Sequence, residues 1–158
     1  DPDTTMGMLI DNTHADNVHS FIRGGESQST LFLDGRKNPW PAAVGPTIFV
    51  DVDPASTLSR EEIFGPVAAL VKFDDEQQVI EQANNTIYGL ASYFYSNDAA
   101  RIWRVSEQLE YGMVGINTGL ISNEVAPFGG VKQSGLGREG SEHGIEDYLE
   151  MKYLCQGL

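Results

Sequence analysis

The sequence feature that most constrains the fold is a regular alternation of apolar and amphipathic segments between residues 67 and 117. Three of the segments are apolar enough to form buried strands of a parallel sheet. They are residues 67–73 (VAALVKF), 90–95 (LASYFY) and 113–117 (MVGIN). The segments between them carry apolar side chains at helical spacing and begin with Asp or Asn residues that can cap a helix. This pattern predicts two consecutive βαβ units, and hence an α/β fold with a parallel sheet.

The flanking segments add elements on both sides of this region. We expect a helix from residue 12 or 13 to residue 25, strands at 30–34 and 47–52, a helix at 141–149 and a terminal strand at 151–155. A lone strand near a terminus has unpaired edges. The terminal strand is therefore expected either to join the main sheet or to pair with another subunit.

Residues 115–141 form a glycine-dense stretch, in which seven of 27 residues are glycine. The stretch has no apolar period, yet it contains Phe128, Lys132, Arg138 and Glu139. Long loops of this kind within a compact domain are usually functional or disordered. This one follows directly from the third predicted strand, and ligands of parallel sheets sit beyond the carboxyl ends of the strands. The sequence thus predicts an ordered loop that contributes to a ligand site.

Composition limits the classes of partner. The chain has 158 residues, 41% of them hydrophobic, which is enough to bury a core within one domain. Its formal net charge of −13 disfavours nucleic acid and anionic membranes, because both require Lys and Arg to replace counterions. Small molecules or other proteins are the expected partners.

The number of cysteines and the length of the apolar runs indicate the cellular location of the protein. A single cysteine excludes a disulfide within the chain and favours a cytoplasmic location. The opening residues, DPDTTMGML, lack the basic segment of a signal peptide. No apolar run approaches the length of about 20 residues that a membrane-spanning helix needs. We therefore expect neither a signal peptide nor a membrane span.

Several apparent motifs do not carry chemistry. Residues 135–140 (GLGREG) match the dinucleotide-binding pattern G-x-G-x-x-G, but no apolar strand leads into them and no complete βαβ unit follows. Cys155 is interpreted as a small packed side chain of the terminal strand. His14, His19 and His143 lack the spacing of metal ligands and are interpreted as surface residues, so no metal is expected. Composition and spacing alone yield no complete catalytic set.

Glu62 and Phe64 precede the first predicted parallel strand and are followed by a Gly-Pro pair. A carboxylate can accept hydrogen bonds from two ribose hydroxyls, and an aromatic ring can pack against a flat heterocycle. Taken alone, however, a solvated glutamate and a core phenylalanine are the simpler interpretation.

Two longer motifs change that interpretation. Residues 61–67 (EEIFGPV) and 127–135 (PFGGVKQSG) resemble two C-terminal signatures of NAD(P)-dependent aldehyde dehydrogenases, and the resemblance extends over essentially the whole chain. Residues 117–124 (NTGLISNE), together with GREGS and the ending YLEMKYLC, are most similar to succinate-semialdehyde dehydrogenases. Residues 31–38 (LFLDGRKN) instead resemble methylmalonate-semialdehyde dehydrogenases, which leaves that substrate as an alternative.

The resemblance implies an activity and a set of residues. In the family a cysteine thiolate attacks the aldehyde, hydride passes to the nicotinamide of NAD or NADP, and a glutamate-activated water hydrolyses the thioester. By resemblance, Glu62 holds the hydroxyls of the nicotinamide ribose, and Phe64 packs near the nicotinamide. Ser122 helps to bind the distal carboxylate of the substrate, and Phe128 lines the substrate tunnel. Glu139 is a buried acid near the catalytic water path, and Arg138 is its structural neighbour.

The resemblance also implies what these residues do not supply. The family's nucleophilic cysteine, general-base glutamate, oxyanion-binding asparagine and nucleotide-binding domain all lie upstream of the matched region. Cys155 corresponds to a cysteine near the C-terminal strand and not to the nucleophile. The expected division is therefore residues 1–149 as the C-terminal part of a catalytic domain and residues 150–158 as an oligomerisation strand of a homo-oligomer.

Three interpretations follow from these observations. The first is the C-terminal part of an aldehyde dehydrogenase, inactive alone, in which Glu62, Phe64 and Phe128 converge on one pocket. The second is a non-catalytic assembly or binding module derived from a dehydrogenase. The third is an unrelated α/β protein with chance motifs, which two long matches in the right order disfavour.

Overall fold

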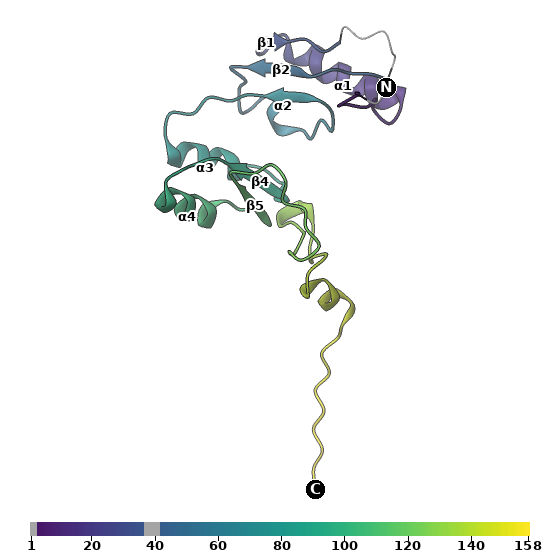
Figure 1. Ribbon diagram of the computed structural model, residues 1–158, viewed down its shortest axis with the longest axis vertical. Coiled ribbons are helices and arrows are strands. Elements are labelled where there is room, and N and C mark those ends of the chain that lie inside the picture. Colours follow the sequence, from purple (N-terminus) through teal and green to yellow (C-terminus); the bar gives the residue numbers. More distant parts are fainter. Residues whose placement is uncertain (1–2, 37–41) are drawn as a thin grey trace. The chain divides into compact units, whose positions relative to one another are not determined.

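The computed structural model describes residues 3–36 and 42–158, and the chain divides into two units, Asp1–Asp74 and Asp75–Leu158 (Figure 1). The elements of the first unit are α1 (Asn12–Gly25), β1 (Thr30–Leu33), β2 (Thr47–Val50), α2 (Thr57–Arg60) and β3 (Val67–Ala69). Those of the second are α3 (Glu76–Asn84), β4 (Ala91–Phe94), α4 (Ala99–Gln108), β5 (Met113–Ile116) and the 3-10 helices η1 (Lys132–Ser134) and η2 (His143–Tyr148). The end of the motif at residues 31–38 lies outside the described residues.

The first unit contains a three-stranded mixed sheet in the order β1-β2-β3. Strand β2 pairs antiparallel with β1 and parallel with β3, placing Thr47 opposite Val67 and Phe49 opposite Ala69. Helix α1 begins where the sequence predicts, because the Asp11 carboxylate accepts a hydrogen bond of 2.7 Å from the backbone N–H of His14.

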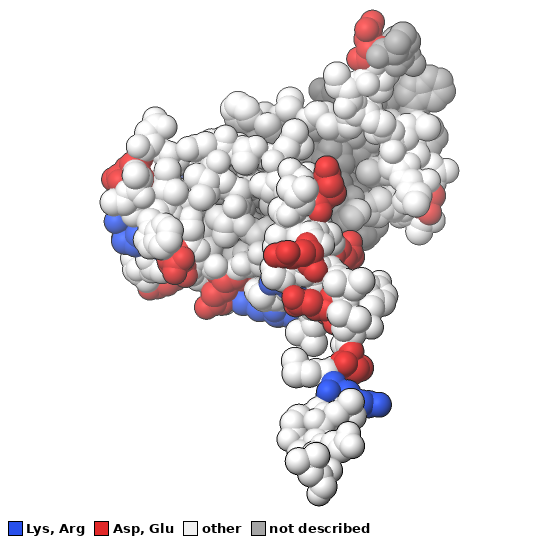
Figure 2. Space-filling model, turned by 60° about the horizontal axis from the view of Figure 1, so that its bottom comes forward, with Lys and Arg blue, Asp and Glu red and all other residues white. Residues whose placement is uncertain are grey.

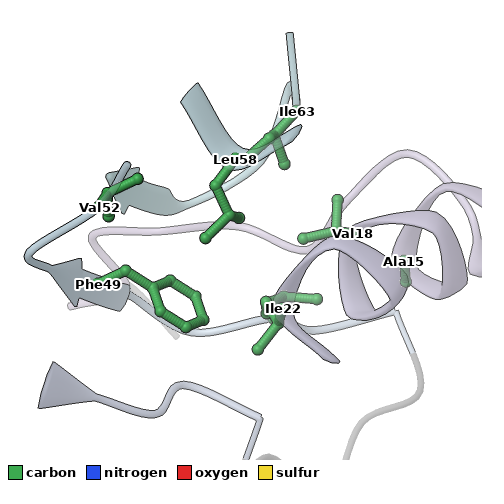
Figure 3. Close-up of a cluster of buried hydrophobic side chains, with 8 residues drawn as sticks. Ala15, Val18, Ile22, Phe49, Val52, Leu58 and Ile63 are labelled. Atoms are coloured by element: carbon green, nitrogen blue, oxygen red, sulfur yellow. The ribbon is translucent and has the colours of Figure 1, made fainter. Parts of the chain in front are cut away.

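The core of the first unit forms between this sheet, α1 and the segment around α2 (Figure 3). Ala15, Val18 and Ile22 recur at helical spacing on α1 and are fully buried. Phe49 of β2 is also fully buried. The remaining members of this buried hydrophobic cluster are Val44, Val52, Leu58 and Ile63.

The second unit contains one complete βαβ unit, as the sequence predicts. Strands β4 and β5 pair in parallel from Ala91 opposite Met113 to Phe94 opposite Ile116, and α4 is the crossover between them. The Asp98 carboxylate caps α4 by accepting hydrogen bonds from the N–H groups of Ala100 and Arg101. Asp75 caps α3 in the same way, through the N–H of Gln78.

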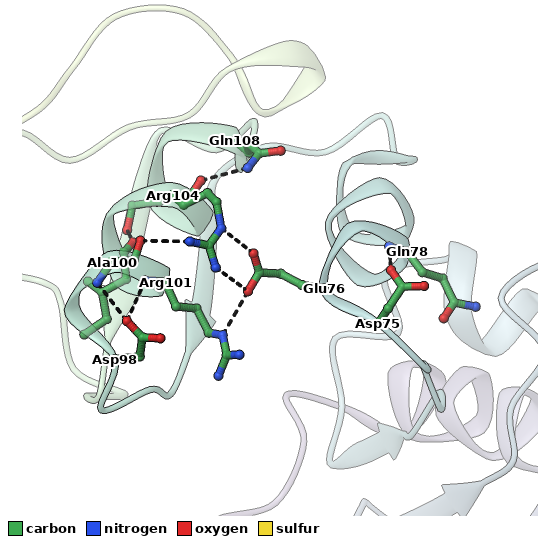
Figure 4. Close-up of polar contacts among 10 residues, drawn as sticks. Asp75, Glu76, Gln78, Asp98, Ala100, Arg101, Arg104 and Gln108 are labelled. Atoms are coloured by element: carbon green, nitrogen blue, oxygen red, sulfur yellow. Dashed lines mark hydrogen bonds and ion pairs between the residues drawn. The ribbon is translucent and has the colours of Figure 1, made fainter.

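Helices α3 and α4 are joined by charged hydrogen bonds (Figure 4). The Glu76 carboxylate in the first turn of α3 accepts hydrogen bonds of 2.6 Å from Nε of Arg104 and 2.9 Å from Nε of Arg101. The hydrogen bond from Arg104 is the main cause that lowers the pKa of Glu76 below its usual value. Because the carboxylate remains partly exposed, water and salt weaken these bonds.

The strand pairing differs from the expected one. Parallel pairing is confirmed, but β3 pairs with β2 and β4 with β5, so β3 and β4 belong to different hydrogen-bonded sheets. The first of the two predicted βαβ units is therefore not formed. Apolar composition identifies a buried strand, but it does not select the partner among several short apolar strands.

The C-terminal predictions also need correction. Residues 141–149 are expected to be helical, and the structure has a shorter 3-10 helix there, η2, in a glycine-containing segment that starts after a positive φ at Ser141. Residues 149–158 form no strand, and the segment runs extended (yellow in Figure 1) with Met151, Tyr153 and Leu154 exposed. An extended segment becomes a strand only when another backbone pairs with it, and no described part of the chain does so.

The Glu76 bonds lead to a testable prediction about stability. Glu76→Gln should lower the urea midpoint of unfolding at neutral pH, and the difference should shrink at high salt as the charges are screened. Because the pKa of Glu76 is lowered in the folded state, the wild-type advantage is present above the unfolded pKa and is lost as the pH falls through the folded pKa.

Glu107→Gln on α4 is the matched control, since it removes the same charge from an exposed position. Equal midpoints for the Glu76 and Glu107 variants at low salt would show that the bonds from Arg101 and Arg104 do not stabilise the second unit.

Candidate functional site

Glu62 and Phe64 lie in the loop between α2 and β3, and both line one cavity of about 390 Å³ in the first unit. Leu58, Val67 and Ala69 contribute apolar wall to the same cavity. Both candidate side chains are exposed, and Phe64 retains 77% of its accessible surface. The structure thus brings together the two residues that the sequence assigns to cofactor binding, with a carboxylate and a ring facing one space.

The residue between them, Ile63, points the opposite way, into the core. Ile63 is only 9% exposed and belongs to the buried hydrophobic cluster of the first unit. Because side chains alternate in extended backbone, burying Ile63 turns the preceding Glu62 towards solvent. Phe64 has a positive φ of +55°, so the alternation does not extend to it.

Gly65 brings this loop close to helix α1. A Cβ atom at this position would lie 2.8 Å from Cγ2 of Val18, which is closer than two carbon atoms normally approach. Glycine is required here by the contact with α1, because its φ is not positive.

The glycine-dense loop of the second unit forms another cavity, of about 740 Å³, lined by Phe128, Arg138 and Glu139 among others. Phe128 and Glu139 exchange two backbone hydrogen bonds, of 2.8 Å from Phe128 N–H and 2.7 Å from Glu139 N–H. Nη1 of Arg138 donates to the carbonyl oxygens of Gly130 and Gly137 at 2.8 and 2.7 Å. Arg138 thus supports the loop backbone.

Polar side chains also fasten this loop to the rest of the second unit. Nζ of Lys132 donates to the carbonyl oxygen of Asn84, at the end of α3, and pairs with the Glu110 carboxylate, both at 2.7 Å. Oγ of Ser134 accepts a 2.9 Å hydrogen bond from the N–H of Gly89. These contacts fix the segment that follows Phe128.

The remaining predicted residues are placed differently. Ser122 is exposed and does not line the described cavities that contain the other candidates. Glu139 was expected to be buried and is exposed, because no described segment of the chain covers its side chain. Cys155 lies exposed in the extended C-terminal segment and lines none of these cavities. The convergence of Glu62 and Phe64 with Phe128 stays a prediction.

Acidic side chains are spread over several places on the face shown in Figure 2, in keeping with the net charge. Within residues 3–36 and 42–158, no group of three or more His, Cys, Asp or Glu side chains could hold a metal ion. His143 pairs with Glu146 at 3.0 Å, and this hydrogen bond raises its pKa above the usual value. No helix in the described ranges combines the length and apolar character needed to cross a membrane.

Three residues with clear structural roles at these sites were missed. Lys132 and Ser134 lie within the motif PFGGVKQSG but received no role from the sequence. His14 was interpreted as a surface residue, whereas its ring contacts the backbone of Phe64 at 2.8 Å. The motif could have drawn attention to the first two, but no sequence signal links residue 14 to residue 64.

Curated proteins with similar sequences are dehydrogenases of aldehydes. The chain is 63% identical over 157 residues to the succinate semialdehyde dehydrogenase of Acinetobacter baylyi and 57% identical over 152 residues to the glutarate-semialdehyde dehydrogenase of Pseudomonas putida. Each alignment covers 96% of this chain and 32% of the relative. The succinate-semialdehyde dehydrogenase (NADP+) of Escherichia coli is 53% identical and is covered to 33%.

Solved structures agree with these relatives. The crystal structure of succinate-semialdehyde dehydrogenase from Burkholderia pseudomallei superimposes with a TM-score of 0.94 at 49% identity, over 100% of this chain and 33% of that one. An NAD+ complex of an aldehyde dehydrogenase from Bacillus cereus gives a TM-score of 0.90 at 37% identity, over 95% of this chain and 31% of that one.

The chain thus spans about one third of the length of the relatives it matches. The model of the aldehyde dehydrogenase family matches residues 1–154, and so covers both units and nearly all of the chain. The two motifs, the relatives and the superimposed structures agree, and the chain belongs to the aldehyde dehydrogenase family.

Proposed function

We propose that this chain supplies the cofactor- and substrate-contacting C-terminal part of an NAD(P)+-dependent dehydrogenase that oxidises succinic semialdehyde to succinate. The observation that carries the proposal is that Glu62 and Phe64 line one cavity with exposed side chains. Residues 1–149 form part of the catalytic domain in this proposal, and residues 150–158 are the segment through which subunits associate.

The cavity fits the nicotinamide half of NAD or NADP in its chemistry. The Glu62 carboxylate offers two oxygen atoms to the hydroxyls of a ribose, and the exposed face of Phe64 offers a surface for a flat ring. When bound, the cofactor takes up the hydride that leaves the carbon of the substrate. The residues of this chain bind and orient it.

The substrate proposal rests on the relatives and on the glycine-dense loop. Two of the reported relatives are named for succinate and glutarate semialdehydes, which share an aldehyde at one end and a carboxylate at the other. Ser122 can donate a hydrogen bond to that carboxylate, and Phe128 offers apolar surface to the carbon chain between the two ends. In the overall reaction the aldehyde loses a hydride and gains an oxygen atom from water.

The chain does not supply the nucleophile in this proposal. Its one cysteine, Cys155, lies in the extended C-terminal segment and lines none of the cavities that contain the candidate residues. Arg138 and Glu139 support the loop of the second unit instead of reacting with the substrate.

The cofactor role can be tested by titrating the isotope-labelled 158-residue chain with NAD+ and NADP+ and following its amide NMR signals. Wild type should show shifts at Glu62 and Phe64. Glu62→Gln should raise the apparent Kd by about one to two orders of magnitude, because loss of a charged hydrogen bond costs about 1.5–3 kcal/mol. Phe64→Ala should weaken binding similarly.

Glu61→Gln is the control for this titration, since it removes the neighbouring charge from the same cavity. An equal loss of affinity in the Glu61 and Glu62 variants would show that the charge near the cavity, and not a specific hydrogen bond to Glu62, affects binding. The absence of any shift at Glu62 and Phe64 in wild type would contradict the cofactor role.

The chain alone should not catalyse the reaction. We expect no increase in absorbance at the NAD(P)H wavelength when it is mixed with succinic semialdehyde and either cofactor, and the Cys155→Ser variant should behave identically. Glutaric and methylmalonic semialdehydes should give the same result. Cofactor reduction that Cys155→Ser abolishes would make Cys155 a nucleophile and overturn the assignment of roles.

A second candidate function is non-catalytic assembly. The observation in its favour is the extended segment in which Met151, Tyr153 and Leu154 are 101%, 84% and 82% exposed. An unpaired, apolar extended segment can add to the edge of a sheet in another chain.

The association of subunits can be measured by light scattering after gel filtration. The 158-residue chain should form oligomers, and removal of residues 150–158 should give monomers without changing the circular dichroism of the remainder. Tyr148→Ser, which removes an exposed aromatic residue before the segment, is the control and should remain oligomeric. Monomers of the intact chain at high concentration would contradict this role.

A further inference from the structure

The ring of His14 contacts a backbone group 50 residues further along the chain. His14 lies in the first turn of α1, and its Nε2 is 2.8 Å from the carbonyl oxygen of Phe64. A carbonyl oxygen only accepts hydrogen bonds, so Nε2 must carry the hydrogen and donate it. The bond therefore requires a hydrogen on Nε2 of His14.

Phe64 has an unusual backbone conformation. Its φ is +55°, in the left-handed region that non-glycine residues rarely occupy. Asp51, Asn117, Lys132 and Ser141 are the other non-glycine residues of the described chain with positive φ. Phe64 is thus the one aromatic residue in this group, and it cannot stabilise the conformation with a polar side chain of its own. The surroundings must therefore stabilise this conformation.

Helix α1 supplies two contacts to this loop from the same face. His14 and Val18 are four residues apart, so they are neighbours on the helix surface. Val18 packs against Gly65, where a Cβ would come within 2.8 Å of its Cγ2, and His14 binds the preceding carbonyl. The Asp11 cap at the N–H of His14 fixes the start of the helix that carries both.

The burial of Ile63 alone does not determine the conformation of Phe64. It fixes the direction of one side chain, but the backbone after it can still rotate. The hydrogen bond from His14 restrains the carbonyl group of Phe64. The close contact with Val18 restrains the next residue, Gly65. The Phe64 ring is 77% exposed in this arrangement.

We propose that His14 is a positioning residue, whose Nε2–H bond to the Phe64 carbonyl holds the left-handed conformation that presents the Phe64 ring to a bound nicotinamide. The presentation of the ring to a nicotinamide rests on the proposed cofactor role of Glu62 and Phe64. The effect of the His14 bond on the conformation of Phe64 is independent of that role. His14 itself touches neither substrate nor cofactor in this role.

The test uses three variants of the isotope-labelled 158-residue chain. His14→Ala removes the donor, and His14→Gln retains an N–H donor on a side chain of similar reach. His19→Ala removes another histidine of α1 and is the matched control. The conformation of Phe64 is read from its amide-to-α coupling constant and its Cα and Cβ chemical shifts, and the tautomer of His14 from its ring nitrogen shifts.

We expect wild-type His14 to be protonated at Nε2. In His14→Ala the Phe64 signals should leave their left-handed values, while His14→Gln and His19→Ala should retain them. The apparent Kd for NAD+ should rise about threefold in His14→Ala only, as expected for the loss of one neutral hydrogen bond.

Two results would overturn the inference: unchanged Phe64 signals in folded His14→Ala, or a wild-type His14 without hydrogen at Nε2. The ring nitrogen shifts of wild-type His14 test the hydrogen bond to Phe64 even where His14→Ala does not fold. If NAD+ shifts the amide NMR signals of neither Glu62 nor Phe64 in wild type, the proposed function fails. The coupling constant of Phe64 and the ring nitrogen shifts of His14 still test the conformational role of His14 in that case.

Discussion

The packing of helix α1 against the sheet and the Glu61–Gly65 loop is the interaction on which the first unit depends. Val18, Ile22 and Phe49 are fully buried there, and each such side chain contributes about 1.5–3 kcal/mol. That sum exceeds the cost of one left-handed residue, about 1–3 kcal/mol. The core can therefore hold Phe64 in an unfavourable backbone conformation, and the site inherits its geometry from buried residues that face away from it.

The second unit fixes its glycine-dense loop by other means. Its glycine-dense loop buries little apolar surface, and charged side chains bind backbone oxygens instead: Lys132 at Asn84, and Arg138 at Gly130 and Gly137. Hydrogen bonds that involve a charged group are stronger than those between neutral groups, so a few of them can hold such a loop. Polar anchoring suits a loop whose glycines leave few side chains to pack.

Local signals predicted the elements well and their partners poorly. The apolar spacing of α1 and the caps at Asp75 and Asp98 placed three helices within a residue or two of their observed starts. Pairing depends on contacts between distant segments, so the sequence did not show that β3 joins β2. The expected terminal strand needs a partner backbone, which local composition cannot reveal. The four-residue α2 was too short for an apolar period and was missed.

The candidate site was predictable where a motif spans it and unpredictable elsewhere. Glu62 and Phe64 lie in one motif and Phe128 in another, and the structure places each in a cavity. His14 belongs to neither, and its contact with Phe64 depends on how α1 packs. Each unit thus holds its candidate residues at a cavity on its own scaffold, and the one thiol of the chain lines neither of these two cavities. The proposal that these residues orient a cofactor and do not make bonds rests on this separation of the candidate residues from the thiol.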